Sequence, residues 1–163
     1  MYIFAIILGF AILGFIVYRN WKQQSQLTSE GKIIDRDRHF IEQAEDFTIA
    51  CDDPNRIVIG VQSLAYSEMK ISMTADEQNQ AFRFTYTTAM GSWNALLYCT
   101  GAPDGQVTYR FQFTSWRTSD YGVIGEVQMN MLLTAIEKMF LSIDPNTQVQ
   151  TSLLETKTKH KLL

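Results

Sequence analysis

The segment VTYRFQFT, residues 107–114, alternates apolar and polar side chains without a break. Successive side chains of a β-strand point to opposite faces of a sheet, so this pattern predicts a strand with one buried face and one wet face. Residues 69–74 and 82–87 alternate in the same way, whereas residues 93–100 are more apolar on both sides, as in a central strand. Short turns such as Ala-Pro-Asp-Gly at 102–105 predict an antiparallel meander.

A helical pattern precedes these strands. Residues 37–51 carry apolar side chains at helical spacing, with Glu42, Glu45 and Asp46 on the opposite side. We therefore predict a helix whose acidic face is solvated, although its end, residues 47–51, is also compatible with a short strand.

Two further helices are predicted from their boundaries. Asp52-Asp53-Pro54 is a typical helix start, because aspartate caps free N–H groups and proline has no N–H to leave unpaired. The apolar residues of 57–65 then share one helical face, although residues 56–61 are also compatible with a strand. The strongest helical pattern covers residues 127–143, and Asp144-Pro145-Asn146 ends it.

These elements predict a single α+β domain over residues 36–163, in which residues 147–159 form a last edge strand. Helices are expected to cover one face of a four- or five-stranded antiparallel sheet, which gives a two-layer domain. The core between the layers is predicted to consist of Phe82, Phe84, Tyr86, Tyr109, Phe111 and Phe113, packed against Leu132, Ile136 and Phe140.

The N-terminal eighteen residues contain no charged side chain, and Arg19 and Lys22 follow directly. A helix of that length is about 27 Å long, close to the thickness of the hydrocarbon core of a bilayer. A signal peptide would have a basic region before the apolar run and a small-residue cleavage pattern after it, and the sequence shows neither. We predict a transmembrane anchor helix over residues 1–18 and a juxtamembrane linker over residues 19–35, helical as far as Glu30.

The distribution of lysine and arginine predicts the orientation of this anchor. Basic side chains follow the apolar segment and none precedes it, so the positive-inside rule places the C-terminal domain in the cytoplasm. The absence of Asn-x-Ser/Thr glycosylation sites agrees with this placement. We expect a single-pass membrane protein that contacts the lipid bilayer through residues 1–18. Ala5 and Gly9 form a small-xxx-small pair that is compatible with a weak homo-oligomer.

Residues capable of catalysis or metal binding are few. The chain contains only two histidines, His39 and His160, and neither has a second ligand nearby at metal spacing. Cys51 and Cys99 have no base placed beside them by the sequence. The net charge of −3 gives no attraction to nucleic acid. We therefore expect no metal, no cofactor, no nucleic-acid partner and no catalytic residue.

The wet face of the sheet is the strongest candidate binding surface. Cations, hydroxyl groups and one large aromatic ring share it if the strand registers match, and these suit a protein partner or an anionic ligand. The candidate residues are Arg83, Thr85, Arg110, Gln112, Thr114 and Trp116.

An anchor, a packed domain and the lack of a catalytic motif together predict a membrane-anchored, non-catalytic interaction or accessory domain that faces the cytoplasm. Its expected partner is a protein in a membrane assembly. One alternative is a ligand-sensing domain with a pocket between the sheet and the helices. The other alternative is an enzyme of unrecognised type.

Overall fold

The structure is a computed structural model that describes residues 2–50, 53–76, 81–101, 105–120 and 122–154, apart from the side chains of residues 2–5 and of Ile7. The chain divides into two compact units, Met1–Asp35 and Arg36–Leu163. Most of the predicted turn at 102–105, Cys51-Asp52, and the end of the predicted last strand lie outside the described residues.

The first unit contains one long helix, α1 (Tyr2–Ser29), and the turn that ends it. Gly31 has a φ of 66°, and its N–H donates to the Thr28 carbonyl at 2.9 Å, while the Lys32 N–H donates to the Leu27 carbonyl at 2.8 Å. This pair of bonds is a Schellman motif, which requires a left-handed residue and therefore favours glycine. The predicted end of this helix before Gly31 is confirmed.

The predicted membrane span over residues 1–18 falls within α1. Within the part of the chain that the structure describes, no helix contains a stretch long and apolar enough to cross a bilayer. The structure thus shows the helix but gives the predicted span no support. Met1 and the side chains of residues 2–5 and Ile7 lie outside the described residues.

The second unit is built on a six-stranded antiparallel sheet with the strand order β2-β3-β4-β5-β1-β8. Its first four members are consecutive in the chain, which confirms the predicted meander, and β1 then inserts between β5 and β8. The strands are β1 (Gln43–Ala50), β2 (Ile71–Asp76), β3 (Ala81–Thr88), β4 (Gly91–Gly101), β5 (Gln106–Ser115) and β8 (Gln148–Leu153). A small hairpin, β6 (Thr118–Ser119) and β7 (Gly122–Val123), follows β5.

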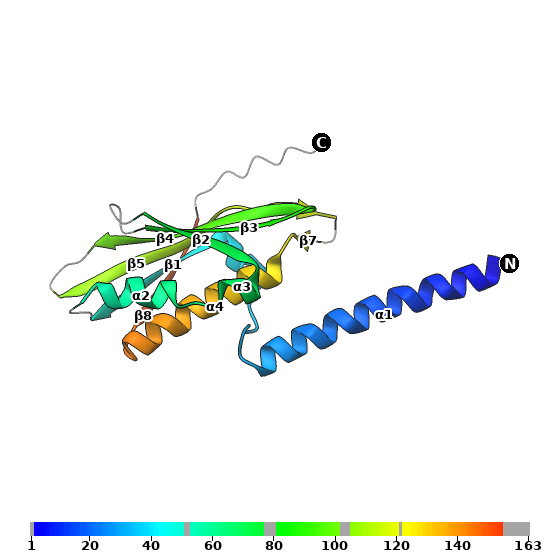
Figure 1. The fold of residues 1–163 in the computed structure, drawn as a ribbon, viewed down its shortest axis with the longest axis horizontal. Coiled ribbons are helices and arrows are strands. Elements are labelled where there is room, and N and C mark those ends of the chain that lie inside the picture. Colours follow the sequence, from blue (N-terminus) through cyan, green and yellow to red (C-terminus); the bar gives the residue numbers. More distant parts are fainter. Residues whose placement is uncertain (1, 51–52, 77–80, 102–104, 121, 155–163) are drawn as a thin grey trace. The chain divides into compact units, whose positions relative to one another are not determined.

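Helices cover one face of this sheet (Figure 1). They are α2 (Asn55–Gln62), the single turn α3 (Tyr66–Met69) and the long helix α4 (Glu126–Ile143). The Asp53 carboxylate accepts a bond from the Asn55 N–H at 3.0 Å, as the predicted helix start requires. The rings of Phe47 on β1 and Phe140 on α4 stack with their centroids 4.6 Å apart, which places the core between the two layers.

The predicted core is confirmed, since every one of its nine residues is at most 8% exposed. Trp93, fully buried, lies among them and stacks on Tyr86 with ring centroids 5.5 Å apart. The strength of the 127–143 helical pattern and the period-two pattern of the meander explain this success, because both extend over many residues.

The predicted helix over residues 37–51 is wrong. Only the 3₁₀ turn η1 (Arg38–Glu42) is helical, and β1 follows it, so the alternative of a strand at 47–51 was closer. The spacing of the apolar residues in this segment fits both the period of a helix and that of a strand. Pairing with β5 on one side and β8 on the other stabilises the strand. The sheet therefore has six strands instead of four or five. The acidic face is also wrong, because the strand period buries Glu45 beside Phe47.

Candidate functional site

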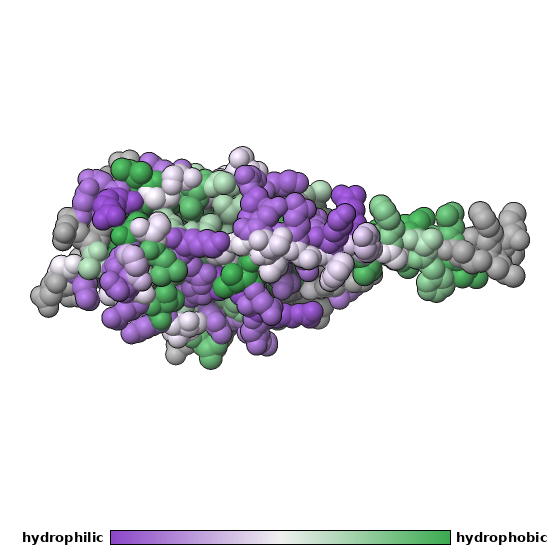
Figure 2. Space-filling model, turned by 90° about the horizontal axis from the view of Figure 1, so that it is seen from below, coloured by the Kyte–Doolittle hydropathy of each residue, from purple (hydrophilic) through white to green (hydrophobic). Residues whose placement is uncertain are grey.

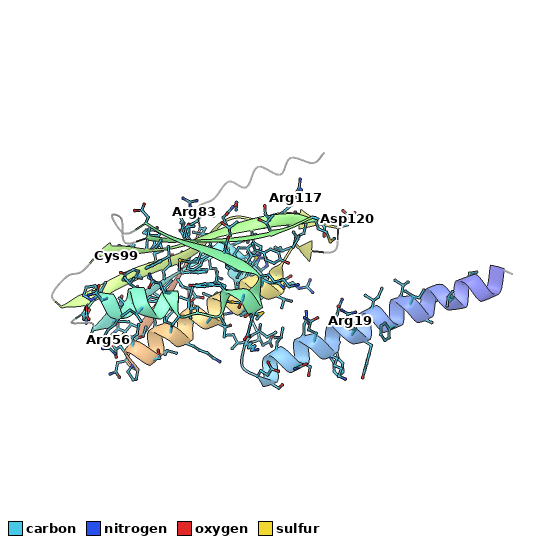
Figure 3. All side chains as sticks on the ribbon, viewed as in Figure 1. Arg19, Arg56, Arg83, Cys99, Arg117 and Asp120 are labelled. Carbon is cyan, nitrogen blue, oxygen red and sulfur yellow. The ribbon has the colours of Figure 1, made fainter. Side chains whose placement is uncertain are left out.

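The sheet face opposite the helices, called here the open face, brings the predicted residues together. Strand partners in an antiparallel sheet share a face, so the register Arg83–Leu96–Gln112 forms one row across β3, β4 and β5. Thr85 and Asn94 form a neighbouring row. Figure 3 shows Arg83 on the side of the sheet away from α2 and α4. Within the described residues of the second unit, Arg36–Leu163, no helix covers this face (Figure 1).

Asn94 on β4 forms hydrogen bonds with polar groups of the neighbouring strands β3 and β5, including two of the predicted residues. The Thr85 hydroxyl donates to Asn94 Oδ1 at 2.9 Å, and Asn94 Nδ2 donates to the Ser115 hydroxyl at 2.9 Å. The Thr114 hydroxyl donates to the Asn94 carbonyl at 3.3 Å. These hydroxyls therefore contribute to sheet structure, and the hydroxyl protons of Thr85 and Thr114 are already donated within the sheet.

Arg110 is also committed to the protein. Its Nε and Nη2 donate to the two carboxylate oxygens of Asp46 on β1, at 2.8 and 2.6 Å. Hydrogen bonding to Asp46 raises the pKa of the Arg110 guanidinium above its usual value. This bidentate pair neutralises the charge, so Arg110 offers little to an anionic ligand.

Arg83 is exposed and has no ion-pair partner among the described residues. Leu96 and Tyr98 on β4 also lie on the open face, because their register partners Gln112 and Arg110 lie there. Both side chains are half-buried. Trp116 follows the end of β5 and is half-buried, but no strand pairing assigns it to either face. The open face therefore combines apolar and aromatic side chains on a central strand with the Arg83 guanidinium, which has no ion-pair partner among the residues that the structure describes.

Sequence reasoning missed Leu96 and Tyr98 as surface residues. The signal was present, because residues 93–100 are more apolar on both sides than the neighbouring strands. That pattern was attributed to a central strand with both faces buried, whereas the helices of Arg36–Leu163 cover only one face of β4.

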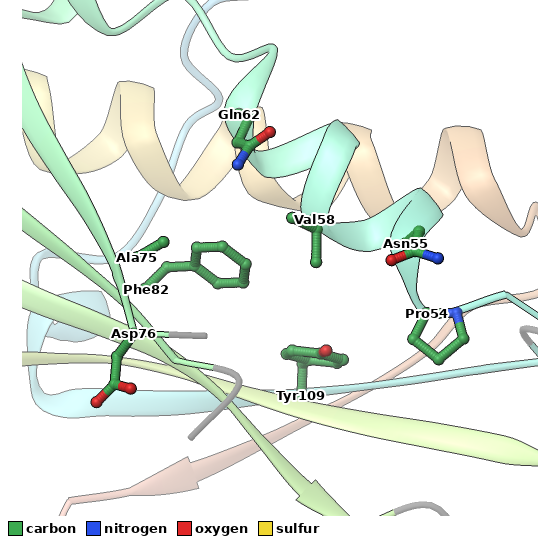
Figure 4. A pocket seen from close by; sticks show the side chains of 8 residues that line it. All are labelled: Pro54, Asn55, Val58, Gln62, Ala75, Asp76, Phe82 and Tyr109. Carbon is green, nitrogen blue, oxygen red and sulfur yellow. The ribbon is translucent and has the colours of Figure 1, made fainter. Parts of the chain in front are cut away.

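A hollow lies between α2 and the sheet (Figure 4). It has a volume of about 340 Å³, and its lining combines the rings of Phe82 and Tyr109 with Val58 and the amide side chains of Asn55 and Gln62. Pro54, Ala75 and Asp76 complete the lining within the described residues. Apolar walls with a few polar groups are typical of small-molecule pockets.

A buried ionic cluster joins the start of the domain to α4. The Arg36 guanidinium contacts the Glu137 carboxylate and lies 3.6 Å from Glu45 Oε1, and it donates to Asn130 Oδ1 at 3.2 Å. Glu45 is 7% exposed. Burial, followed by repulsion from Glu137, raises the pKa of Glu45 to about 7, against the opposing attraction of Arg36.

Other reactive side chains are dispersed. His39 is exposed and lies 3.3 Å from the Glu42 carboxylate, and the Cys99 thiol contacts the Gly101 carbonyl at 3.7 Å. Among the described residues, no three histidine, cysteine or acidic side chains lie close enough together to bind a metal ion. His160 and Cys51 lie outside the described residues.

Comparison with models of known protein families and with curated protein sequences finds no match for this chain.

Proposed function

We propose that this protein is a membrane-tethered, non-catalytic interaction domain whose open face binds a protein partner in a membrane assembly. The observation that carries the proposal is the composition of that face. Tyrosine, tryptophan and arginine are enriched where proteins bind each other tightly, and such contacts are surrounded by polar groups that exclude water. Tyr98, Leu96 and Arg83 have this arrangement, with Gln112 and Asn94 around them.

The tether is proposed from the sequence and from α1. The apolar run of residues 1–18 has the length of a membrane span. In the described part of α1, large apolar side chains are exposed, as lipid contact would favour, and Figure 2 shows one face of this apolar segment. They are Ile6, Leu8, Phe10, Ile12, Leu13, Phe15, Ile16 and Val17. The basic residues that follow favour a cytoplasmic domain.

Site-specific photo-cross-linking in cells tests the partner surface. A photoreactive phenylalanine analogue in place of Tyr98 should form a cross-link to one partner protein. The matched control carries the analogue in place of Ile59, an exposed apolar side chain on α2, and should not form that cross-link. Arg83→Glu in the same chain should reduce the cross-link at the Tyr98 position severalfold, because it reverses the free charge beside the contact.

Equal cross-linking from the Tyr98 and Ile59 positions would reject the open face as the partner surface. The same conclusion would follow if Arg83→Glu left the Tyr98 cross-link unchanged.

Ligand sensing is a second candidate, favoured by the hollow between α2 and the sheet. Its volume of about 340 Å³ falls within the range of about 300–1,000 Å³ that is typical of ligand pockets. Val58→Trp should fill the hollow. A library of small apolar amides that raises the thermal unfolding midpoint of the wild type, but not that of this variant, would support sensing.

A further inference from the structure

Strand β8 forms one of the two edges of the sheet, and β2 forms the other. The outward direction of the backbone groups of β8 follows from its pairing with β1. The Leu154 N–H donates to the Glu42 carbonyl at 2.9 Å, in line with the β1–β8 register. Hydrogen-bonded and non-bonded pairs alternate along an antiparallel ladder. The N–H and C=O groups of Val149, Thr151 and Leu153 therefore point away from β1, to the outside of the sheet.

This edge lacks the usual protection against pairing. Proteins protect exposed edge strands with lysine, proline, bulges or very short strands. The β8 sequence QVQTSL contains no charge and no proline, and its pairing with β1 runs over six consecutive residue pairs without a bulge. In the described part of the chain, no strand pairs with its outer side.

We propose that β8 pairs antiparallel with β8 of a second copy of this chain, about a two-fold axis at Thr151. Thr151 then faces Thr151 of the other copy, and Val149 faces Leu153. Each facing pair exchanges both of its N–H···O bonds, because these are the residues whose backbone groups point outward. The two sheets join into one continuous sheet.

The side chains of β8 are self-complementary in this register. Val149 and Leu153 are 45% and 75% exposed, and the dimer pairs them with each other across the axis. Thr–Thr pairs across strands are favourable, and Gln150 opposes Ser152 on the other face. Since β8 has no charged residue, the symmetric arrangement places no like charges together. This agreement favours a second copy over an unrelated strand.

The dimer does not depend on the proposed partner surface. Edge-to-edge pairing extends the sheet sideways, so the open face of each copy stays accessible.

Replacing Thr151 by proline tests this contact in the full-length protein, purified in mild detergent. The Thr151 N–H points outward, so Thr151→Pro removes one dimer hydrogen bond from each copy, two in all, while leaving the ladder to β1 intact. Analytical ultracentrifugation should show a dimer dissociation constant at least about tenfold higher than that of the wild type, as expected for the loss of two hydrogen bonds. The matched control Thr151→Val keeps the donor and should change the constant less than about twofold.

A charge pair tests the register itself. Val149→Glu and Leu153→Lys should each weaken the dimer, and the double variant should restore it, because each introduced carboxylate then faces the introduced ammonium of the other copy. Leu153→Lys alters an exposed side chain and keeps the test valid if Thr151→Pro fails to fold.

Three results would overturn the proposal: a wild-type monomer at about 100 μM, a Thr151→Pro dimer as strong as the wild type, or a double variant without rescue. A monomer whose outward β8 amides resist hydrogen exchange would show that another segment of the same chain occupies the edge.

Discussion

Gly125 lies at the start of α4, where both the backbone conformation and the neighbouring side chains restrict the residue type. It precedes α4 with a φ of 76°, and a Cβ atom there would lie 2.6 Å from the Tyr86 ring and 2.8 Å from Trp93 Nε1. Both the backbone and the packed rings therefore require glycine at this position. The sequence alone did not predict that two buried aromatic side chains would lie against this glycine.

Gly125→Ala should lower the free energy of unfolding by roughly 2–4 kcal/mol, because left-handed strain and overpacking add. Gly105→Ala is the matched control. Gly105 has a similar φ of 79°, but a Cβ atom there would meet no neighbouring atom within 4 Å, so the substitution should cost only about 1 kcal/mol. Chemical denaturation of both variants measures the difference, and equal losses would contradict the packing argument.

The buried carboxyl group of Glu45 should make the stability of the folded protein depend on pH. Its pKa is raised from 4.5 to about 7 in the folded protein, so the folded state holds a proton that the unfolded chain releases between these values. Stability should therefore fall as the pH rises from about 4.5 to about 7 and then level off.

Glu45→Gln should remove this dependence and make the protein relatively more stable above pH 7, by roughly 2–3 kcal/mol. Urea denaturation at a series of pH values measures it. Asp120→Asn, at an exposed position, is the control and should keep the wild-type slope. A wild-type curve that is flat between pH 4.5 and 7 would show that Glu45 is not responsible.

At the scale of the element, predictability followed the length and clarity of the pattern. The 127–143 helix and the strand at 107–114 were predicted closely, since α4 begins at Glu126 and ends at Ile143, and β5 covers Gln106–Ser115. β1 was predicted only as an alternative, over residues 47–51, because its apolar spacing fits two periods and its neighbours in the sheet are distant in sequence.

The same distance limited prediction of the open face. Arg83 and Gln112 were placed on one face by alternation alone, but their separation by Leu96 depends on strand order. The pairing of Arg110 with Asp46 needs β1 beside β5, which local sequence does not reveal.

Phe140 is the aromatic residue that α4 contributes to the core. Phe140 is fully buried and packs on Phe47 and Tyr109. Phe140→Ala should lower the free energy of unfolding by about 3–5 kcal/mol, because it leaves a cavity between the layers. Leu141→Ala, at the adjacent position that is 45% exposed, should cost less than about 1.5 kcal/mol. Similar losses for both variants would contradict this placement of the core.

At the scale of the whole molecule, the two units should behave independently. Deleting residues 2–18 should move the protein from the membrane fraction to the supernatant after cell breakage, if these residues form the proposed tether. The thermal unfolding midpoint of the remaining chain should stay within about 2 °C, since the deletion lies outside Arg36–Leu163. Fusing an unrelated single-pass anchor should restore the membrane fraction, and persistence of the deleted chain in membranes would contradict the tether.

The position of β1 has a consequence for folding during synthesis. β1 is the first strand made, yet its two neighbours, β5 and β8, emerge from the ribosome much later. Until then both of its edges stay unpaired, and pairing between distant segments is slow. The sheet is complete only after β8, the last strand, has been released. Chains that terminate before Gln148 would therefore leave the β8-side edge of β1 unpaired and prone to aggregation.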